Sequence, residues 1–228
     1  MSGKVIAISG GFGILGEAAV KGALSSGWTV VAIDRADAPR DSFPDGVDRR
    51  GGVDLTAAEA TADLFNAIVE QHGRLDALLN IAGGFRWETL EDGHIDSWDF
   101  LYEINVKTAA TACKMALPYL KAAPAGRIVN VGAAAALKAG MGMGAYAASK
   151  SGVMRLTEAL AEELKSTNVT VNAVLPSIID TPQNRQDMPD TDPDIWVKPA
   201  DLASVMLFLA SDEARAITGA LLPVTGKV

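Results

Sequence analysis

Residues 9–16 read Ser9-Gly10-Gly11-Phe12-Gly13-Ile14-Leu15-Gly16, and this stretch decides the fold because it joins an apolar run to a segment of helical composition. Glycines recur in it at intervals of three. In such a turn they permit positive φ angles, close approach of a pyrophosphate to backbone N–H groups, and tight packing of helix on strand. The positive end of the following helix favours the phosphates. The stretch predicts a dinucleotide-binding loop, although a tight strand-to-helix turn needs glycine for steric reasons alone. The candidate contacts are Gly10, Phe12, Gly13, Ile14, Leu15 and Gly16.

Apolar runs of strand length recur along the chain between longer segments of helical composition. The expected strands are Lys4–Ser9, Thr29–Ile33, Leu75–Asn80, Arg127–Val131, Val169–Leu175 and Ala220–Val224, with a further short strand near Arg50–Val53. The expected helices are Leu15–Ser26, Ala57–His72, Trp98–Leu120, Ala145–Lys165 and Pro199–Ser211. Alternating strands and helices require crossover connections, and uninterrupted apolar strands indicate a sheet covered on both faces. The pattern predicts a single Rossmann-type, doubly wound α/β domain over residues 1–228, with a parallel seven-stranded sheet and helices on both faces.

The composition limits the classes of function. The chain has 228 residues, 49% of them hydrophobic, which is enough for one sizeable core. Its formal net charge of −8 and its lack of a Lys/Arg cluster argue against nucleic acid as a partner. No apolar stretch reaches the roughly 18 residues of a transmembrane helix, so no membrane association is expected. The single cysteine, Cys113, argues against a disulfide framework and favours the cytoplasm, and the separation of His72 from His94 argues against a metal site.

Two acidic residues follow predicted strands on the expected cofactor side. Asp34 ends the second strand, where a carboxylate can accept hydrogen bonds from the ribose hydroxyls of an adenosine and would repel a 2′-phosphate. This favours NAD, whereas the adjacent Arg35 could pair with the 2′-phosphate of NADP. Without the surrounding motifs, Asp34 and Arg35 would be ordinary polar residues at the end of a strand. Asp54 and Leu55 are candidate contacts of the adenine ring, although Asp54 also stands where a helix N-cap belongs.

Further motifs match a known family in order and spacing. They are Asp54, Asn80-Ile81-Ala82-Gly83, Asn105, Tyr146-Ala147-Ala148-Ser149-Lys150, Asn172-Ala173-Val174-Leu175-Pro176 and Asp180-Thr181-Pro182. With the glycine loop, they make the chain resemble the short-chain dehydrogenase/reductase family over nearly its whole length. The resemblance implies an NAD(P)-dependent oxidoreductase that acts on a small molecule and assembles as a homodimer or homotetramer.

Tyr146 and Lys150 are the candidate catalytic pair. Residues four apart share one face of a helix, so the charge of Lys150 is expected to lie near the phenol of Tyr146 and to lower its pKa. Without the surrounding motifs, the same two residues would be typical of an amphipathic surface. The family resemblance further implies that Lys150 binds the nicotinamide ribose and that Asn105 holds a water connecting Lys150 to solvent. It places the remaining cofactor contacts at Tyr146, Lys150, Asn80, Ala82, Gly83, Pro176, Ile179 and Thr181.

The chain departs from the family pattern at three positions. Ile14 and Ser177 stand where glycines are usual, and Ala133 stands where many members carry a serine that hydrogen-bonds the substrate oxygen. An alanine cannot donate a hydrogen bond, and loss of one donor to a developing oxyanion costs about 10²–10³ in rate. Two explanations remain open: an impaired enzyme, or a substrate that does not need this donor, such as a conjugated imine or quinonoid ring.

Several stretches resemble one subgroup of the family, quinonoid dihydropteridine reductase, which also lacks the serine. They are the glycine loop, Ala82-Gly83-Gly84-Phe85, Gly132–Leu137, Leu175-Pro176, Asp180-Thr181-Pro182, Asn184-Arg185 and Met188-Pro189. The subgroup implies NADH-dependent reduction of a quinonoid dihydropterin. The irregular stretch at about 177–198 is expected to form a loop over the substrate. The candidate pocket residues are Ala133, Phe85, Trp87, Met141 and Trp196; the aromatic rings would stack on a flat heterocycle or serve only to pack a lid.

Two other functions stay open. The chain can be a carbonyl or alcohol oxidoreductase of the same family with an atypical, serine-less site. It can also be a weakly catalytic NAD(H)-binding regulatory protein, because a fold alone does not guarantee chemistry.

Overall fold

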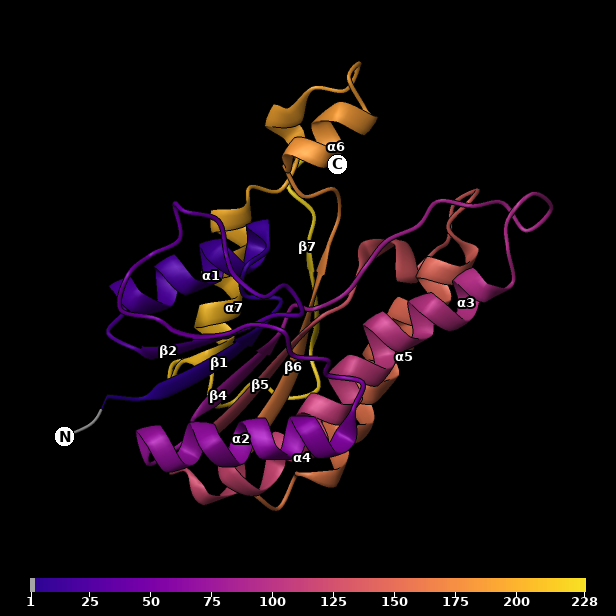
Figure 1. Cartoon of the computed structure of the whole chain (residues 1–228). Coiled ribbons are helices and arrows are strands. Elements are labelled where there is room, and N and C mark those ends of the chain that lie inside the picture. Colours follow the sequence, from indigo (N-terminus) through magenta and orange to yellow (C-terminus); the bar gives the residue numbers. More distant parts are fainter. Residues whose placement is uncertain (1–2) are drawn as a thin grey trace.

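A seven-stranded sheet forms the centre of the computed structural model, which describes residues 3–228 (Figure 1). The strands lie in the order β3-β2-β1-β4-β5-β6-β7, and every neighbouring pair is parallel. This confirms the predicted Rossmann-type, doubly wound fold. The strands are β1 (Val5–Ser9), β2 (Thr29–Ile33), β3 (Asp48–Arg50), β4 (Ala77–Asn80), β5 (Gly126–Val131), β6 (Val169–Pro176) and β7 (Leu221–Val224).

Helices cover both faces of the sheet (Figure 1). On one face α1 (Ile14–Ser25) packs beside α7 (Pro199–Ala210), and on the other lie α2 (Ala58–His72), α4 (Thr108–Ala122) and α5 (Gly144–Glu163). Side chains alternate along a strand, so Ile6 and Ile8 of β1 join the first core while Val5 and Ala7 join the second. A strand with a core on each side has no solvent-facing positions, which explains the continuous apolar runs.

The predicted helix Trp98–Leu120 is present but contains a π-helical turn that the sequence pattern did not predict. The structure divides it into α3 (Asp96–Leu101), a π-helical turn at Tyr102–Lys107, and α4. π-turns insert an extra residue and are frequent at functional sites, and this one contains Asn105. Because helical periodicity spans such an insertion with little disturbance, the sequence pattern did not reveal it.

Two other elements differ from expectation in detail. The short strand expected near Arg50–Val53 is β3, which ends at Arg50. The expected loop at 177–198 contains a short helix, α6 (Pro182–Asp187), and a 3₁₀ turn at Pro193–Ile195.

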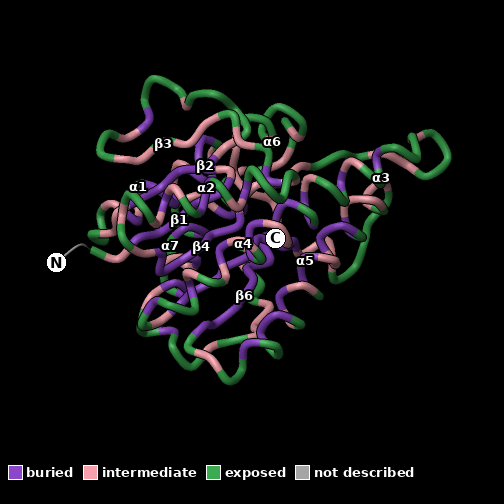
Figure 2. Tube along the Cα trace, turned by 60° about the horizontal axis from the view of Figure 1, so that its bottom comes forward, coloured by how far each residue is buried: buried purple, intermediate pink, exposed green. Residues whose placement is uncertain are grey.

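The carboxyl ends of the central strands meet at one edge of the sheet, because all the strands are parallel. β1 has β2 on one side and β4 on the other, so the strand order reverses between β1 and β4. In such sheets, ligands bind in the crevice outside the carboxyl ends at this reversal. Figure 2 shows the buried sheet and, beyond it, an exposed arm at α3 that projects from the body.

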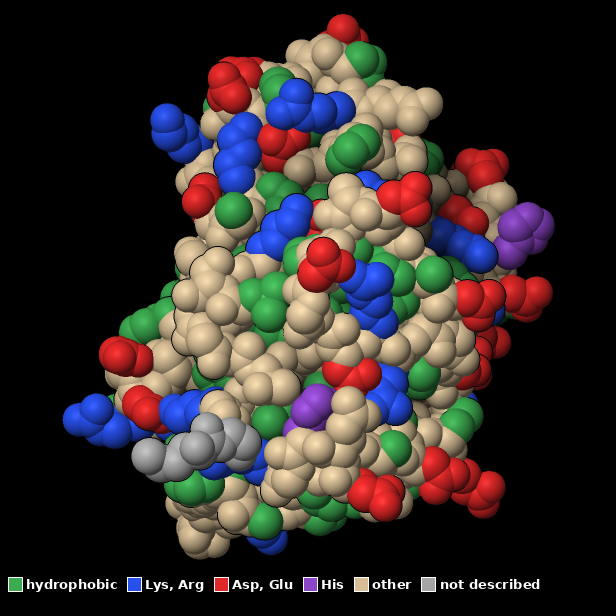
Figure 3. Space-filling model, turned by 60° about the vertical axis from the view of Figure 1, so that its left-hand side comes forward, with side chains coloured by type: hydrophobic (Ala, Val, Ile, Leu, Met, Phe, Trp, Pro, Cys, Tyr) green, Lys and Arg blue, Asp and Glu red, His purple; other side chains and the backbone are tan. Residues whose placement is uncertain are grey.

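The surface carries charges of both signs. Figure 3 shows acidic and basic side chains interspersed over one face of the molecule. Among residues 3–228, no helix has the length and apolar character needed to cross a membrane. Over the same residues, no group of three or more His, Cys, Asp or Glu side chains is arranged to hold a metal ion.

We expect Gly16→Ala to destabilise the protein while Gly13→Ala has little effect. A Cβ at Gly16 would lie 2.0 Å from the Gly10 carbonyl oxygen, whereas a Cβ at Gly13 would lie 3.4 Å from the same atom. Overpacking against backbone costs about 1–3 kcal/mol, so urea unfolding without cofactor should separate the two variants. Equal free energies of unfolding for both variants would contradict the close packing of α1 on β1.

Candidate active site

A cleft of about 1090 Å³ opens at the carboxyl edge of the sheet. It brings together most of the predicted cofactor contacts from five separate segments, namely Gly10, Phe12, Gly13, Ile14, Leu15, Gly16, Asp34, Arg35, Asp54, Leu55, Ala82, Gly83 and Thr181. Sequence reasoning missed other lining residues, among them Ala36, Pro39, Arg40, Phe100, Ile104 and Gln183. Phe100 and Ile104 carried no signal, because apolar residues on a helix are more often core.

The glycine loop is held against the β4 loop at the floor of the cleft. Gly10 has φ +66°, and a Cβ there would lie 2.8 Å from the backbone nitrogen of Ala82. The Oγ of Ser9 accepts hydrogen bonds from the N–H groups of Ile81 and Ala82, at 3.1 and 3.2 Å. This close packing leaves a side-chain-free cradle at the N-terminus of α1, which fits the pyrophosphate of a dinucleotide.

Asp34 borders the glycine loop directly. Its Oδ2 accepts from the N–H of Phe12 and its Oδ1 from the N–H of Ala36, both at 3.0 Å. The carboxylate is thereby fixed on the wall of the cleft.

Asp54 has a local partner as well as a place in the cleft. Its Oδ1 accepts from both the backbone N–H and the hydroxyl of Thr56, at 2.9 and 2.7 Å. These hydrogen bonds lower the pKa of the Asp54 carboxyl. The alternative of an N-cap is not met, because α2 begins at Ala58 and no side chain caps it.

Lys150, Asn105 and Gly83 meet at one point beside the cleft. The buried Nζ of Lys150 donates to the carbonyl of Val131 at 2.9 Å. A Cβ on Gly83 would lie 2.5 Å from Oδ1 of Asn105 and 3.2 Å from that Nζ. The arm that follows β4 (residues 81–95) can therefore pass over Lys150 only because position 83 is glycine.

Asn105 is built into the backbone of this arm and into α5. Its Oδ1 accepts from the N–H of Gly84, and its Nδ2 donates to the Gly84 carbonyl and to Oγ of Ser149, each at 3.0 Å. The Ser149 hydroxyl donates in turn to the Tyr146 carbonyl at 2.8 Å. Asn105 therefore positions both the arm and the helical turn that carries Tyr146.

The expected lowering of the Tyr146 pKa by Lys150 is not found. Burial raises the pKa of Tyr146 to about 12 and lowers that of Lys150 to about 8. Both shifts have one cause, since a poorly solvated site disfavours the charged form of either group. The phenol is protonated at neutral pH and is suited to donate a proton.

Five predicted cofactor contacts are not among the residues that line the cleft. Two of them are Tyr146 and Lys150, described above, and the other three are Asn80, Pro176 and Ile179. The Nδ2 of Asn80 is buried and donates to Oδ1 of Asn130 at 2.8 Å and to Sγ of Cys113 at 3.2 Å. Pro176 is buried at the end of β6, and Ile179 packs against the core and pairs with Val197. As placed, these residues support the site from behind. Burial raises the pKa of the Cys113 thiol to about 12.

The predicted pocket residues divide into two groups. Phe85, Trp87 and Met141 are exposed, and the ring of Phe85 meets that of Tyr146 edge-on with centroids 4.9 Å apart. Ala133 is buried at the end of β5. Trp196 requires a correction: only 3% of it is exposed, so it forms no wall of an open pocket and serves to pack the 177–198 loop.

The structure also reveals a contact between two segments of the exposed rim. Trp87 lies against Gly142, where φ is +73° and a Cβ would lie 2.2 Å from the indole. The N–H of Glu88 donates to the Gly142 carbonyl at 2.9 Å. This contact couples the arm after β4 to the loop that leads into α5.

We expect the Nζ of Lys150 to titrate near pH 8, because burial penalises the ammonium form. NMR of ¹⁵N-labelled lysine side chains would follow the titration, with Lys150→Met identifying the signal by its loss. The residue should be charged below this pH and neutral above it. A titration midpoint above 10 would contradict the burial of this group.

Comparison with known proteins agrees with the fold and the motifs. The family model described as short chain dehydrogenase matches residues 4–192. The chain is 31% identical to the 3-oxoacyl-[acyl-carrier-protein] reductase of Thermotoga maritima, with 99% of this chain and 98% of that protein aligned. It is 32% identical to the meso-2,3-butanediol dehydrogenase of Serratia marcescens, with 98% and 93% aligned.

Solved structures show the same architecture. The aldohexose dehydrogenase of Thermoplasma acidophilum superposes with a TM-score of 0.89 at 26% identity, covering 99% of this chain and 93% of that one. An NAD⁺-bound xylitol dehydrogenase superposes with a TM-score of 0.89 at 25% identity, covering 99% and 98%. The chain belongs to the short-chain dehydrogenase/reductase family and is an NAD(P)-dependent oxidoreductase.

Proposed function

We propose that the enzyme uses NADH to reduce a planar, conjugated, nitrogen-containing acceptor of the quinonoid dihydropterin type. The observation that carries the proposal is the methyl group of Ala133 at the position where many members of the family place a serine. The sequence has no serine or threonine from Gly126 to Ala148. An acceptor that spreads the incoming charge over its own ring nitrogens has less need of that donor.

Tyr146 is the proton donor in this proposal. The phenol is protonated at neutral pH and can supply the proton that a reduction needs. Lys150 would hold the nicotinamide ribose. Asn105 fixes the Gly84 backbone directly and fixes the helical turn of Tyr146 through Ser149. When bound, the nicotinamide supplies the hydride.

The rim of the site suits a flat ring. Phe85 lies against Tyr146, and Trp87 and Met141 are exposed close to the same helix terminus, with Trp87 held by Gly142. Aromatic and thioether groups make favourable contacts with π-systems. The motif likeness to quinonoid dihydropteridine reductase supports the same class of acceptor.

A second candidate function is reduction of a carbonyl group or oxidation of an alcohol. The names of the aligned relatives favour it, because they include a 3-oxoacyl reductase and a butanediol dehydrogenase. A third reading, a weakly catalytic NAD(H)-binding regulator, is disfavoured by the retained Tyr146, Lys150 and Asn105.

Ala133→Ser distinguishes the first two candidates. We expect the wild-type enzyme to reduce a quinonoid dihydropterin faster than simple ketones, and the variant to gain nothing on the pterin. An NADH-oxidation assay with a panel of both acceptor classes measures this, with Ala134→Ser as the control for adding a hydroxyl nearby. A rise in ketone reduction of about 10²-fold in Ala133→Ser alone would instead favour carbonyl chemistry. NADH binding with no turnover on any acceptor would favour the regulator.

Cofactor choice depends on the charge of Asp34. We expect kcat/KM with NADH to exceed that with NADPH by at least about 10-fold, because repulsion of a 2′-phosphate by a nearby carboxylate is worth about 1–4 kcal/mol. Asp34→Asn keeps an acceptor for the Phe12 N–H, removes the charge, and should narrow the ratio. Asp37→Asn makes the same charge change at a residue that does not line the cleft, and it should leave the ratio of kcat/KM values for NADH and NADPH unchanged. Equal use of both cofactors by the wild type would count against NAD.

We further propose that the chain forms a homodimer or homotetramer through α4 and α5. These long helices lie together on one face of the sheet, and a two-fold axis would pair them with their copies. We also propose that the protein is cytoplasmic, because it has a single cysteine and so no disulfide framework.

A further inference from the structure

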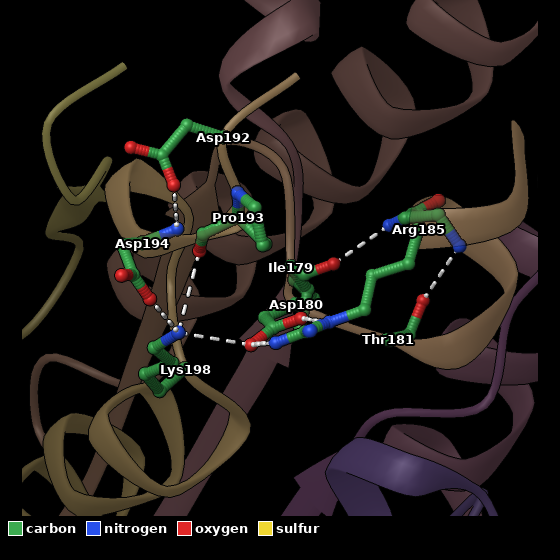
Figure 4. Close-up of polar contacts among 9 residues, drawn as sticks. Ile179, Asp180, Thr181, Arg185, Asp192, Pro193, Asp194 and Lys198 are labelled. Atoms are coloured by element: carbon green, nitrogen blue, oxygen red, sulfur yellow. Dashed lines mark hydrogen bonds and ion pairs between the residues drawn. The ribbon is translucent and has the colours of Figure 1, made fainter. Parts of the chain in front are cut away.

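One carboxylate, that of Asp180, gathers two cations at the base of the 177–198 loop (Figure 4). Arg185 approaches it in a bidentate manner, with Nε 2.6 Å from Oδ1 and Nη2 2.8 Å from Oδ2. Lys198 donates to Oδ2 at 3.0 Å. The Asp180 side chain is only 10% exposed, and these partners hold its pKa far below the usual range.

The two cations come from different parts of the loop. Arg185 belongs to α6, whereas Lys198 directly precedes α7 and also donates to the Pro193 carbonyl at 3.3 Å. The backbone reinforces the closure, because the N–H of Asp180 donates to the Val197 carbonyl at 2.8 Å. Asp180 therefore fastens the start, the helix and the end of the loop at one point.

The residue after Asp180 faces the cofactor cleft. Thr181, Pro182 and Gln183 line the same cleft as the glycine loop. The Oγ1 of Thr181 accepts from the N–H of Asn184, which fixes this hydroxyl at the N-terminus of α6. A shift of α6 relative to β6 would carry Thr181 with it.

We propose that Asp180 is a positioning residue that sets the height of Thr181 over the cofactor, so that its ion pairs determine NADH affinity. The inference rests on the proposed NADH contact at Thr181. Arg185 and Lys198 act through the carboxylate and touch no reacting atom in this arrangement. The ion pairs join segments of the loop to each other, so their loss alters the placement of α6 and leaves the sheet intact.

Asp180→Asn tests the proposal, because it preserves shape and removes the charge. We expect Kd and KM for NADH to rise about 10-fold, with a much smaller change in kcat, since losing a hydrogen bond from Thr181 to the cofactor weakens binding by about this factor. Kd is measured by calorimetry without acceptor. Hydrogen exchange of residues 181–187 in the cofactor-free protein should also become faster.

Asp212→Asn is the matched control. Asp212 forms an ion pair with Lys4 at 2.7 Å and lies outside the cleft lining. The Asp212→Asn variant should have the wild-type Kd for NADH and the wild-type rate of hydrogen exchange at residues 181–187. Lys198→Met retains the Arg185 pair and should raise Kd by less than Asp180→Asn, which tests the proposal if the latter folds poorly. Asp180→Glu should recover part of the affinity.

Two results would overturn the proposal: wild-type NADH affinity in Asp180→Asn and Lys198→Met, or an equal loss of affinity in Asp212→Asn. Failure of the proposed acceptor chemistry is separate. A wild-type protein that binds NADH but reduces no pterin contradicts the acceptor assignment, while the affinity comparison remains decisive for Asp180.

Discussion

The buried ammonium group of Lys150 is the feature on which the arrangement of the site depends. Removing a charge from water is costly unless polar groups replace the solvent, and the Val131 carbonyl does so at the end of β5. Position 83 must lack a side chain, because Lys150 and Asn105 fill the space. Asn105 reaches the arm from a π-helical turn. The end of β5, the segment after β4 and the π-helical turn, which are distant in sequence, thus lie around the Lys150 side chain. Tyr146 lies one turn before Lys150 in α5.

Features that act over short stretches of chain could be predicted from the sequence. Apolar runs located β1, β2 and β6, and the glycine spacing located the loop against which α1 packs. Contacts between distant segments could not, and they decide the burial of Trp196 and the partner of Asn80. The pKa of Tyr146 is instructive, because helical spacing placed Lys150 nearby but could not show that both groups lose solvent.

The proposed function rests on a protonated Tyr146 and on the missing serine. Poor solvation raises the pKa of Tyr146, so the phenol keeps its proton at neutral pH. Ala133 places a methyl group where many members of the family have a hydrogen-bond donor to the substrate oxygen. Under the proposed function, a site without this donor stabilises little charge on a ketone oxygen and suits an acceptor that delocalises charge internally.

Under the proposed function, the contact of Trp87 with Gly142 links the width of the substrate opening to the orientation of the proton donor, Tyr146. Gly142 lies two residues before α5 begins, and Tyr146 lies in the first turn of that helix. A bulky acceptor that displaces the indole must push on the same backbone that starts the helix. Under the proposed function, we therefore expect broader substrate scope and accurate proton delivery to oppose each other. A variant selected for larger substrates would have to weaken the Trp87–Gly142 contact before its reaction became faster.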